Sequence, residues 1–531
     1  MREVENCDPV QHALDLGYGI DEIRKLLEEG ISSEELFAIK TPSVTAINFL
    51  NNAPALVISK SLKPEDFTDA GNAKLFSEIC SGQVIFVLSR GWAVWDSLRF
   101  VFNELFVLSL ALQFSEQMLL EATAELFDSR KKQTIAETSG DRVSIALASK
   151  AVTEAKTFHR HAMLTREATR ISRFLDLARA YLYIDADQLD HDAFLLNTPS
   201  GIVDLRTGGL KPHTPVALCS KITAIGPGKR GKHLWLEFLH RITGGDAQLE
   251  YFLQLIVGMS AVGSVFQESL IVAFGVGGNG KSSFFNSCLA ALGDYSGSID
   301  PEVLLVGKQN KAHDLAELRG KRLVIAAELE EGRRLSASML KRLVSTDLIS
   351  AERKYLDPEF FRPTHSLILF TNHMPKIGSC DYGTWRRIVL VPFSANLTGT
   401  GEIKNYADFL VKEAGESIIQ WIIDGAKAFI DNGCNLLMPD LVINVTKQYE
   451  RDNDWVQNFL DDCCIIGDGQ CAFGGALYTR YRNWSDQNKD FTRSNRAFMD
   501  GLILKGFKNH KTKKGSIWDG LSLNSSFGGE R

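Results

Sequence analysis

The stretch IVAFGVGGNGKSS, residues 271–283, constrains the fold of this chain more than any other part of its sequence. It opens on a short apolar run, which is typical of a buried parallel strand. The pattern Gly275-x-x-x-x-Gly280-Lys281-Ser282 follows at once, and apolar residues then recur at helical spacing. A strand, a glycine-rich loop and a helix in this order predict a phosphate-binding loop.

Such a loop holds the phosphates of a nucleoside triphosphate mainly through its backbone. Glycine lacks a Cβ, so N–H groups can close around the phosphates, and the helix N-terminus adds its positive end. We expect Lys281 to reach the terminal phosphates from a solvent-open loop, and the Ser282 hydroxyl to bind Mg²⁺. The alternative is a glycine-rich turn before an ordinary helix, but the complete pattern with both flanks favours an ATP site. The residues expected to contact ATP are Gly275, Val276, Gly277, Gly278, Asn279, Gly280, Lys281, Ser282 and Ser283.

Four polar residues further along the chain lie next to apolar runs and are candidates for hydrolysis. Glu328 ends one such run, where a carboxylate would lie near the attacking water and Mg²⁺. Asn372 ends another and could bind the γ-phosphate and the lytic water. Arg386 and Arg387 precede a third run, and either suits an arginine finger donated to a neighbouring subunit's ATP. The structural alternatives are a surface glutamate, a turn-forming asparagine and salt-bridging arginines.

The composition narrows the classes of protein that remain. The 531 residues suffice for three or four domains, and 44% hydrophobic with 23% charged residues is ordinary for a soluble protein. Because the net charge is −6, contact with nucleic acid would need a local basic patch. The nine cysteines form no CxxC pair, which fits a reducing compartment without a cysteine metal site. No signal peptide is evident and the longest apolar run, 105–112, is too short for a membrane span, so we expect a cytoplasmic protein.

Two basic segments could supply the patch for DNA. In residues 349–356 the pattern alternates as in a strand, with Arg353 and Lys354 on opposite faces, and a turn signal follows. A cation there could grip the phosphates of a single strand. Near the C-terminus, a helix over 495–504 capped by Ser494 would be followed by a basic wing. Its lysines are Lys508, Lys511, Lys513 and Lys514. A solvated charged face is the alternative for both segments.

Taken together, the order of these motifs resembles the superfamily III helicases, and more closely the phage and plasmid primase–helicases related to the poxvirus primase–helicase. The stretch 340–375, LKRLVSTDLISAERKYLDPEFFRPTHSLILFTNHMP, looks like the third motif of that family, which forms a hairpin lining the pore of a hexameric ring. Upstream, DAGNA at 69–73, Trp92–Asp96 and Asn197–Leu210 resemble the domain that precedes the helicase. Downstream, TRYRNWSDQNK and Trp518-Asp519-Gly520 resemble its winged helix.

The resemblance implies an α/β protein with a P-loop, AAA+-like core, a mainly helical collar and a C-terminal winged helix. The expected divisions are a short helical segment, the collar-like domain, the ATPase domain and the winged helix, at 1–60, 61–230, 231–440 and 441–531. About 60 leading residues are too few for a polymerase-type palm, so we expect no primase domain. Two features depart from the family pattern: Ala327 precedes Glu328 where a second acidic residue is common, and Ser345-Thr346 replace a Gly-Gly pair.

The implied function is that of a DNA helicase of phage or plasmid replication in a bacterial cytoplasm. It would form a hexameric homo-oligomer, hydrolyse ATP with Mg²⁺ at subunit interfaces, move along single-stranded or forked DNA, and work with a separate primase or polymerase. Two alternatives remain open. One is an initiator that uses ATP to assemble at an origin, and the other is a P-loop ATPase that remodels protein partners.

Overall fold

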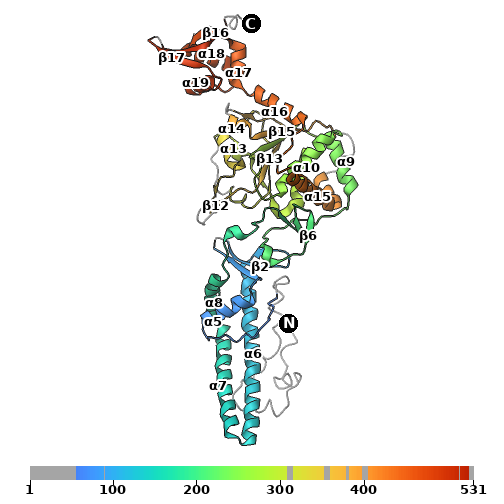
Figure 1. The fold of residues 1–531 in the computed structure, drawn as a ribbon, viewed down its shortest axis with the longest axis vertical. Coiled ribbons are helices and arrows are strands. Elements are labelled where there is room, and N and C mark those ends of the chain that lie inside the picture. The colour runs from blue at the N-terminus through green and yellow to red at the C-terminus, as the bar shows by residue number, and fades with distance from the viewer. Residues whose placement is uncertain are drawn as a thin grey trace, which may run out of the picture. The chain divides into compact units, whose positions relative to one another are not determined.

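Strands and helices group into two units in the computed structural model (Figure 1). The first unit comprises the chain up to His191 together with the later segment Thr214–Ser220. The second unit comprises Asp192–His213 and the chain from Lys221 onward. The helices expected before residue 60 lie outside the described residues. The structure describes residues 55–88, 90–307, 315–351, 359–377, 382–397, 405–488, 490–513 and 515–524.

In its described residues, the first unit has a small antiparallel sheet and four α-helices. Two of these, α6 and α7, lie side by side as a long hairpin (Figure 1), which agrees with the mainly helical character expected of the collar-like domain. The helices are α5 (Asp69–Ile79), α6 (Glu104–Ser139), α7 (Arg142–Thr165) and α8 (Ala168–Tyr181), with 3₁₀ turns η1 (Ala186–Gln188) and η2 (Pro215–Ala217). The strands are β1 (Val84–Val87), β2 (Gly91–Trp95) and β3 (Phe100–Phe102).

Helix α6 is the single helix in the described part of the chain that is long and apolar enough to cross a membrane. Half of its apolar window is nevertheless buried inside the protein. The side chains of Leu110, Phe114 and Met118 are fully buried, in one cluster with Phe76 of α5 and Phe174 of α8. This packing accounts for the apolar sequence of α6 as that of a core helix.

A three-stranded antiparallel sheet, β4 to β6, belongs to the second unit, although the expected domain boundary was residue 230. The difference arises because Leu196 and Val203 of this sheet pack in the same buried cluster as Trp235. The three strands of this sheet are short. They are β4 (Leu195–Thr198), β5 (Gly201–Asp204) and β6 (Gly209–Lys211).

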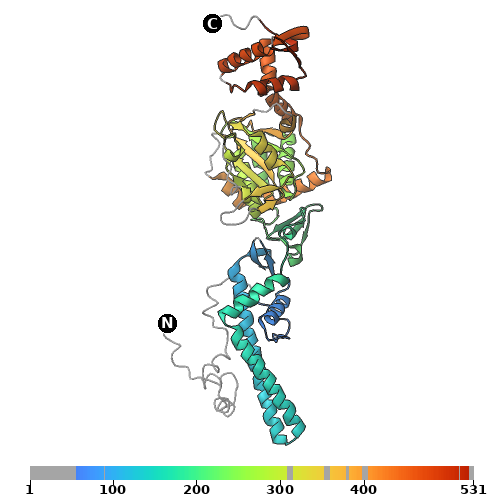
Figure 2. The ribbon, with the colours of Figure 1, turned by 90° about the vertical axis from the view of Figure 1, so that its left-hand side faces the viewer.

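The second unit is built on a parallel sheet, whose strands are visible among the surrounding helices in Figure 2. The strand order is β15-β7-β13-β9-β8. Its strands are short and mostly buried, as expected for a parallel sheet covered on both faces. Alternate residues point to opposite faces: Ile271 joins one apolar cluster and Val272 the other. The strands are β7 (Leu270–Phe274), β8 (Ser296–Ile299), β9 (Leu323–Ala327), β13 (Ser366–Thr371) and β15 (Ile388–Pro392).

Helices cover both faces of this sheet. On one face the core contains residues of α9 (Lys232–Thr243), α10 (Ala247–Ala261), α11 (Lys281–Leu292) and α15 (Tyr406–Asp431). On the other it contains residues of α13 (Ala337–Val344), α14 (Tyr382–Trp385) and α16 (Asp440–Asp452). The remaining short elements are η3 (Gly293–Tyr295), η4 (Pro301–Leu304), β10 (Arg334–Leu335), β11 (Ile349–Ala351), β12 (Glu359–Phe361) and β14 (Lys376–Ile377).

The C-terminal segment combines three helices with an antiparallel sheet in the order β16-β18-β17. Its core is aromatic: Tyr481 and Trp484 are buried beside Phe459, as their helical spacing predicts. The expected helix with Ser494 as its N-cap is present. The elements are α17 (Trp455–Cys463), β16 (Cys464–Phe473), α18 (Gly474–Gln487), α19 (Asn495–Leu504), β17 (Lys508–Thr512) and β18 (Gly515–Leu523).

A close helix contact in the second unit generates a stability prediction. A Cβ added at Gly258 of α10 would lie 2.2 Å from the carbonyl carbon of Gly425 and 2.3 Å from the nitrogen of Ala426, both in α15. Gly258→Ala should therefore force the helices apart, cost about 1–3 kcal/mol, and lower the urea midpoint of unfolding. Gly475→Ala is the matched control, because nothing lies within 4 Å of its added Cβ. Equal midpoints for the two variants would contradict the prediction.

Candidate nucleotide site

The carboxyl ends of three adjacent strands bring the candidate site together. In the register of the sheet, Phe274 of β7 pairs with Thr371 of β13, and Phe370 of β13 pairs with Ala327 of β9. The phosphate loop, Asn372 and Glu328 follow these strands directly. Ligands of open α/β sheets bind at this edge, so the three motifs share the place where a nucleotide would lie.

The phosphate loop adopts a backbone that requires its glycines. Gly278 and Gly280 have φ values of 78° and 84°, in the left-handed region. A Cβ at Gly280 would also lie 2.4 Å from Ile242 Cγ2. The buried Asn279 fixes the loop to the neighbouring strand, since its Nδ2 donates to the carbonyl oxygen of Phe393 at 2.9 Å. The exposed tip of the loop consists of Val276, Gly277 and Gly278.

The side chain of Lys281 is held in place by three hydrogen bonds. Its Nζ donates to the carbonyl oxygen of Gly275 at 2.7 Å and to the Oδ1 atoms of Asn279 and Asn372, both at 3.0 Å. The residue is only 4% exposed, so the expectation of a solvent-open lysine was wrong. The loop folds back over its own lysine, which the sequence pattern does not reveal. Burial lowers the pKa of Lys281, and the nearby negative charge of Glu328 opposes this shift.

Glu328 and Asn372 face one another at the ends of β9 and β13. Asn372 Nδ2 donates to Glu328 Oε2 at 3.2 Å, and both side chains are exposed. Glu328 has a φ of 58°, an unusual conformation for a residue with a Cβ. Its backbone N–H bonds to the carbonyl oxygen of Phe370, and the Leu329 N–H bonds to Thr371 Oγ1. These bonds tie the two strand ends to one another.

The donor set suits a hard divalent cation. Ser282 is exposed in the first turn of α11, Ser283 is partly exposed beside it, and Glu328 offers a carboxylate at the same edge of the sheet. Mg²⁺ prefers such oxygen ligands together with phosphate oxygens. No group of three or more His, Cys, Asp or Glu residues able to hold a metal occurs in the described part of the chain. A metal here would therefore depend on the nucleotide for further ligands.

The two candidate arginines differ sharply in their surroundings. The side chain of Arg387 is 12% exposed, forms an ion pair with Glu268, and donates to the carbonyl oxygen of Gly383 at 2.7 Å. The side chain of Arg386 is 53% exposed and lies 4.0 Å from the same carboxylate. Of the pair, Arg386 has the accessible guanidinium.

The candidate DNA-binding residues are only partly described. Arg353 and Lys354 lie outside the described residues, between β11 and β12, which pair as an antiparallel hairpin. Lys508 and Lys511 are exposed on β17 and Lys513 is exposed in the turn that follows, whereas Lys514 is also outside the described residues.

Two contributors to the site were missed by sequence reasoning. Glu268 holds Arg387 from a position just before β7, and the main chain of Phe393 holds Asn279. Neither carries a sequence signal, because each interaction joins residues more than 110 positions apart. The role of Asn279 could have been suspected only from its place among the loop glycines.

Comparison with known proteins supports the resemblance. Residues 73–244 match the family described as D5 N terminal like, and residues 273–387 match a family of unknown function (DUF5906). The chain is 26% identical over 327 residues to a protein of Acanthamoeba polyphaga mimivirus named as a helicase, L207/L206. It is 22% identical over 232 residues to helicase 022R of Frog virus 3 (isolate Goorha). The chain is thus similar to viral proteins of the primase–helicase type, as its motifs indicate.

These similarities cover parts of each protein. The first match takes in 56% of this chain and 34% of the mimivirus protein, and the second takes in 40% of this chain and 24% of the Frog virus 3 protein. The chain therefore spans about a third or less of these relatives. Among solved structures, the apo C-terminal region of NrS-1 aligns with 56% of this chain and 77% of its own at 12% identity, with a TM-score of 0.35, too low to establish a common fold.

The electrostatic influence of Glu328 on Lys281 generates a testable shift. Glu328→Gln removes a negative charge that favours the ammonium form, so the pKa of Lys281 should fall further below its ordinary 10.5. The pH dependence of Lys281 acetylation, followed by mass spectrometry, should move to lower pH. Glu330→Gln should leave it in place, because Glu330 is exposed and pairs with Arg333. A shift to higher pH in Glu328→Gln would contradict the assignment.

Proposed function

We propose that this protein is an ATP-driven helicase of a viral or plasmid replication system, with a superfamily III type core. One observation carries the proposal: Lys281 of the phosphate loop bonds to Asn372, which in turn bonds to Glu328. Three motifs from separate strands meet within hydrogen-bond distance at one edge of a parallel sheet. The strand order, with β7 inside the sheet, and the helicase names of the viral relatives support it further.

Each residue then has a role set by its surroundings. Lys281 would exchange its present oxygen partners for phosphate oxygens of ATP, and the loop N–H groups would hold the same phosphates. Asn372 would orient the attacking water, and Glu328 would accept its proton. Mg²⁺, held by Ser282 with Glu328 near it, would neutralise phosphate charge when bound.

The proposal extends to assembly and to DNA. An arginine donated by a neighbouring subunit would stabilise the transition state in a hexameric ring, and the exposed Arg386 is the better candidate for this role. Arg387 would hold the segment that carries it, through the Glu268 ion pair. DNA phosphates would contact the hairpin segment around Arg353 and Lys354, and the basic wing formed by Lys508, Lys511, Lys513 and Lys514. The topology of the C-terminal segment is compatible with a winged helix.

Hydrolysis of ATP tests the proposal directly. Lys281→Ala should lower the rate by about a hundredfold or more, since charge stabilisation of the phosphates is lost. Glu328→Gln should retain ATP binding and lose a factor of about 10²–10⁴, because the amide keeps the shape without the base. Hydrolysis would be followed by phosphate release, with and without single-stranded DNA.

Matched controls flank β9 at its two ends. Lys321→Ala alters a partly buried lysine at the amino end of β9, remote from the site, and Glu330→Gln alters an exposed neighbour. Both should hydrolyse ATP at close to the wild-type rate. If Lys281→Ala hydrolyses equally well, the nucleotide is processed elsewhere. If hydrolysis is normal but forked DNA is never unwound, the origin-assembly or protein-remodelling alternatives gain support.

The arginine assignment makes a separate prediction about mixed rings. Arg386→Ala subunits should be folded and inactive alone, and should regain some hydrolysis when mixed with Lys281→Ala subunits. Some interfaces would then pair an intact Lys281 with an intact Arg386. Arg387→Ala should instead lower the urea midpoint, since Glu268 loses its closer partner and keeps only the 4.0 Å contact with Arg386. If Arg387→Ala subunits have a normal urea midpoint and regain hydrolysis when mixed with Lys281→Ala subunits, then Arg387 is the finger and Arg386 is not.

A further inference from the structure

Both catalytic loops lead into one small parallel ribbon. The chain passes from Glu328 to β10 and from Asn372 to β14, and in the ribbon Arg334 pairs with Lys376 and Leu335 with Ile377. The Lys376 N–H also bonds to the carbonyl oxygen of Arg333 at 2.8 Å. Lys376 is only four residues beyond Asn372. A displacement of the β10–β14 ribbon would therefore shift Glu328 and Asn372 relative to one another.

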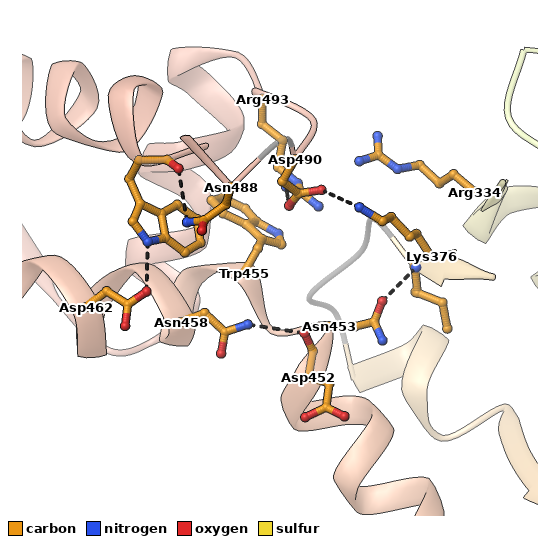
Figure 3. A pocket seen from close by; sticks show the side chains of 12 residues that line it. Arg334, Lys376, Asp452, Asn453, Trp455, Asn458, Asp462, Asn488, Asp490 and Arg493 are labelled. Atoms are coloured by element: carbon orange, nitrogen blue, oxygen red, sulfur yellow. Dashed lines mark hydrogen bonds and ion pairs between the residues drawn. The ribbon is translucent and has the colours of Figure 1, made fainter. Parts of the chain in front are cut away.

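The other side of the ribbon is held by the C-terminal segment (Figure 3). Lys376 Nζ pairs with Asp490 Oδ1 at 3.2 Å, and the guanidinium of Arg334 lies 4.1 Å from the centre of the Phe491 ring. The Ile377 N–H donates to Asn453 Oδ1 at 3.1 Å. These contacts join the ribbon to the loop between α18 and α19 and to the α16–α17 junction.

Asp490 interacts with two basic side chains at this junction. It also lies 3.8 Å from Arg493, whose guanidinium is 4.2 Å from the Trp455 ring centre. Burial favours a higher pKa for Asp490, but its bonds to the Phe491 main chain and to Lys376 hold the pKa below its ordinary value. A polar pocket of about 370 Å³ adjoins these residues and includes Arg334, Lys376, Asp490 and Arg493 in its lining.

We infer that Lys376 and Asp490 are positioning residues, which fix Asn372 and Glu328 through the β10–β14 ribbon and so link hydrolysis to the C-terminal segment. The inference rests on the proposed ATPase function. The described contacts connect the ribbon to the phosphate loop only through the Lys281–Asn372 bond, so the pair acts mainly on the catalytic step and only weakly on nucleotide affinity. By linkage, a ligand that binds the C-terminal segment and moves Asp490 would alter turnover in the same way.

The test is a charge exchange in the full chain. Asp490→Asn should lower kcat for ATP by roughly two- to fivefold, the range for a partly exposed ion pair, with a smaller change in KM. The double variant Lys376→Asp with Asp490→Lys should restore part of kcat, because the pair is rebuilt with opposite polarity while Arg493 repels the new ammonium group. Phe491→Ala, which removes the Arg334 contact, should lower kcat in the same direction. The matched control is Asp431→Asn, which breaks a similar exposed Lys427–Asp431 pair on α15 and should change nothing.

The outcomes separate the inference from the proposed function. If Asp490→Asn and Phe491→Ala both keep the wild-type kcat, the inference is overturned while the ATPase stands. If kcat falls together with the urea midpoint and the exchange restores neither, the pair is structural and the inference also fails. A wild-type chain that neither binds nor hydrolyses ATP would overturn the proposed function itself.

Discussion

The register of one parallel sheet is the constraint on which the candidate site depends. Residues at the ends of β7, β13 and β9 are adjacent only because these strands are paired in parallel, with their carboxyl ends level. A shift of one residue would turn every side chain to the opposite face and break both apolar clusters. Burial of the sheet on two faces therefore fixes the positions of Glu328 and Asn372 as firmly as it fixes the core.

Much of this arrangement could be predicted from local sequence. The apolar runs that become β7, β9, β13 and β15 are short and uninterrupted, and the phosphate loop has a fixed pattern of glycines. The helix expected over residues 495–504 is equally direct, and Ser494 caps it as α19 in the way its position suggests. These features depend on residues within about one turn or one strand of each other, where periodicity and capping rules apply.

The remaining features depend on contacts between distant residues, and the sequence could not supply them. Lys281 is buried because the loop carbonyl of Gly275 and the side chain of Asn372, 91 positions away, close over it. Arg387 is held by Glu268, 119 positions away, so its role differs from that of its neighbour Arg386. The strands β4–β6 join the second unit because Leu196 meets a core that forms far along the chain. In each case the sequence around the distant contacting residue shows no motif that would identify it as a partner.

The tethering of Lys281 has a consequence for how the site would work. A lysine that is only 4% exposed needs oxygen partners for its ammonium group, and the present ones are a backbone carbonyl and two amide oxygens. A triphosphate would offer charged oxygens in their place, so Lys281 would exchange neutral partners for stronger, charge-assisted bonds. Asn372 would be released from the lysine in the same event while its amide nitrogen still faces Glu328. Binding of a triphosphate to the phosphate loop would thus change the hydrogen bonds of Asn372 at the end of β13. Asn372 lies four residues before Lys376, which pairs with Asp490.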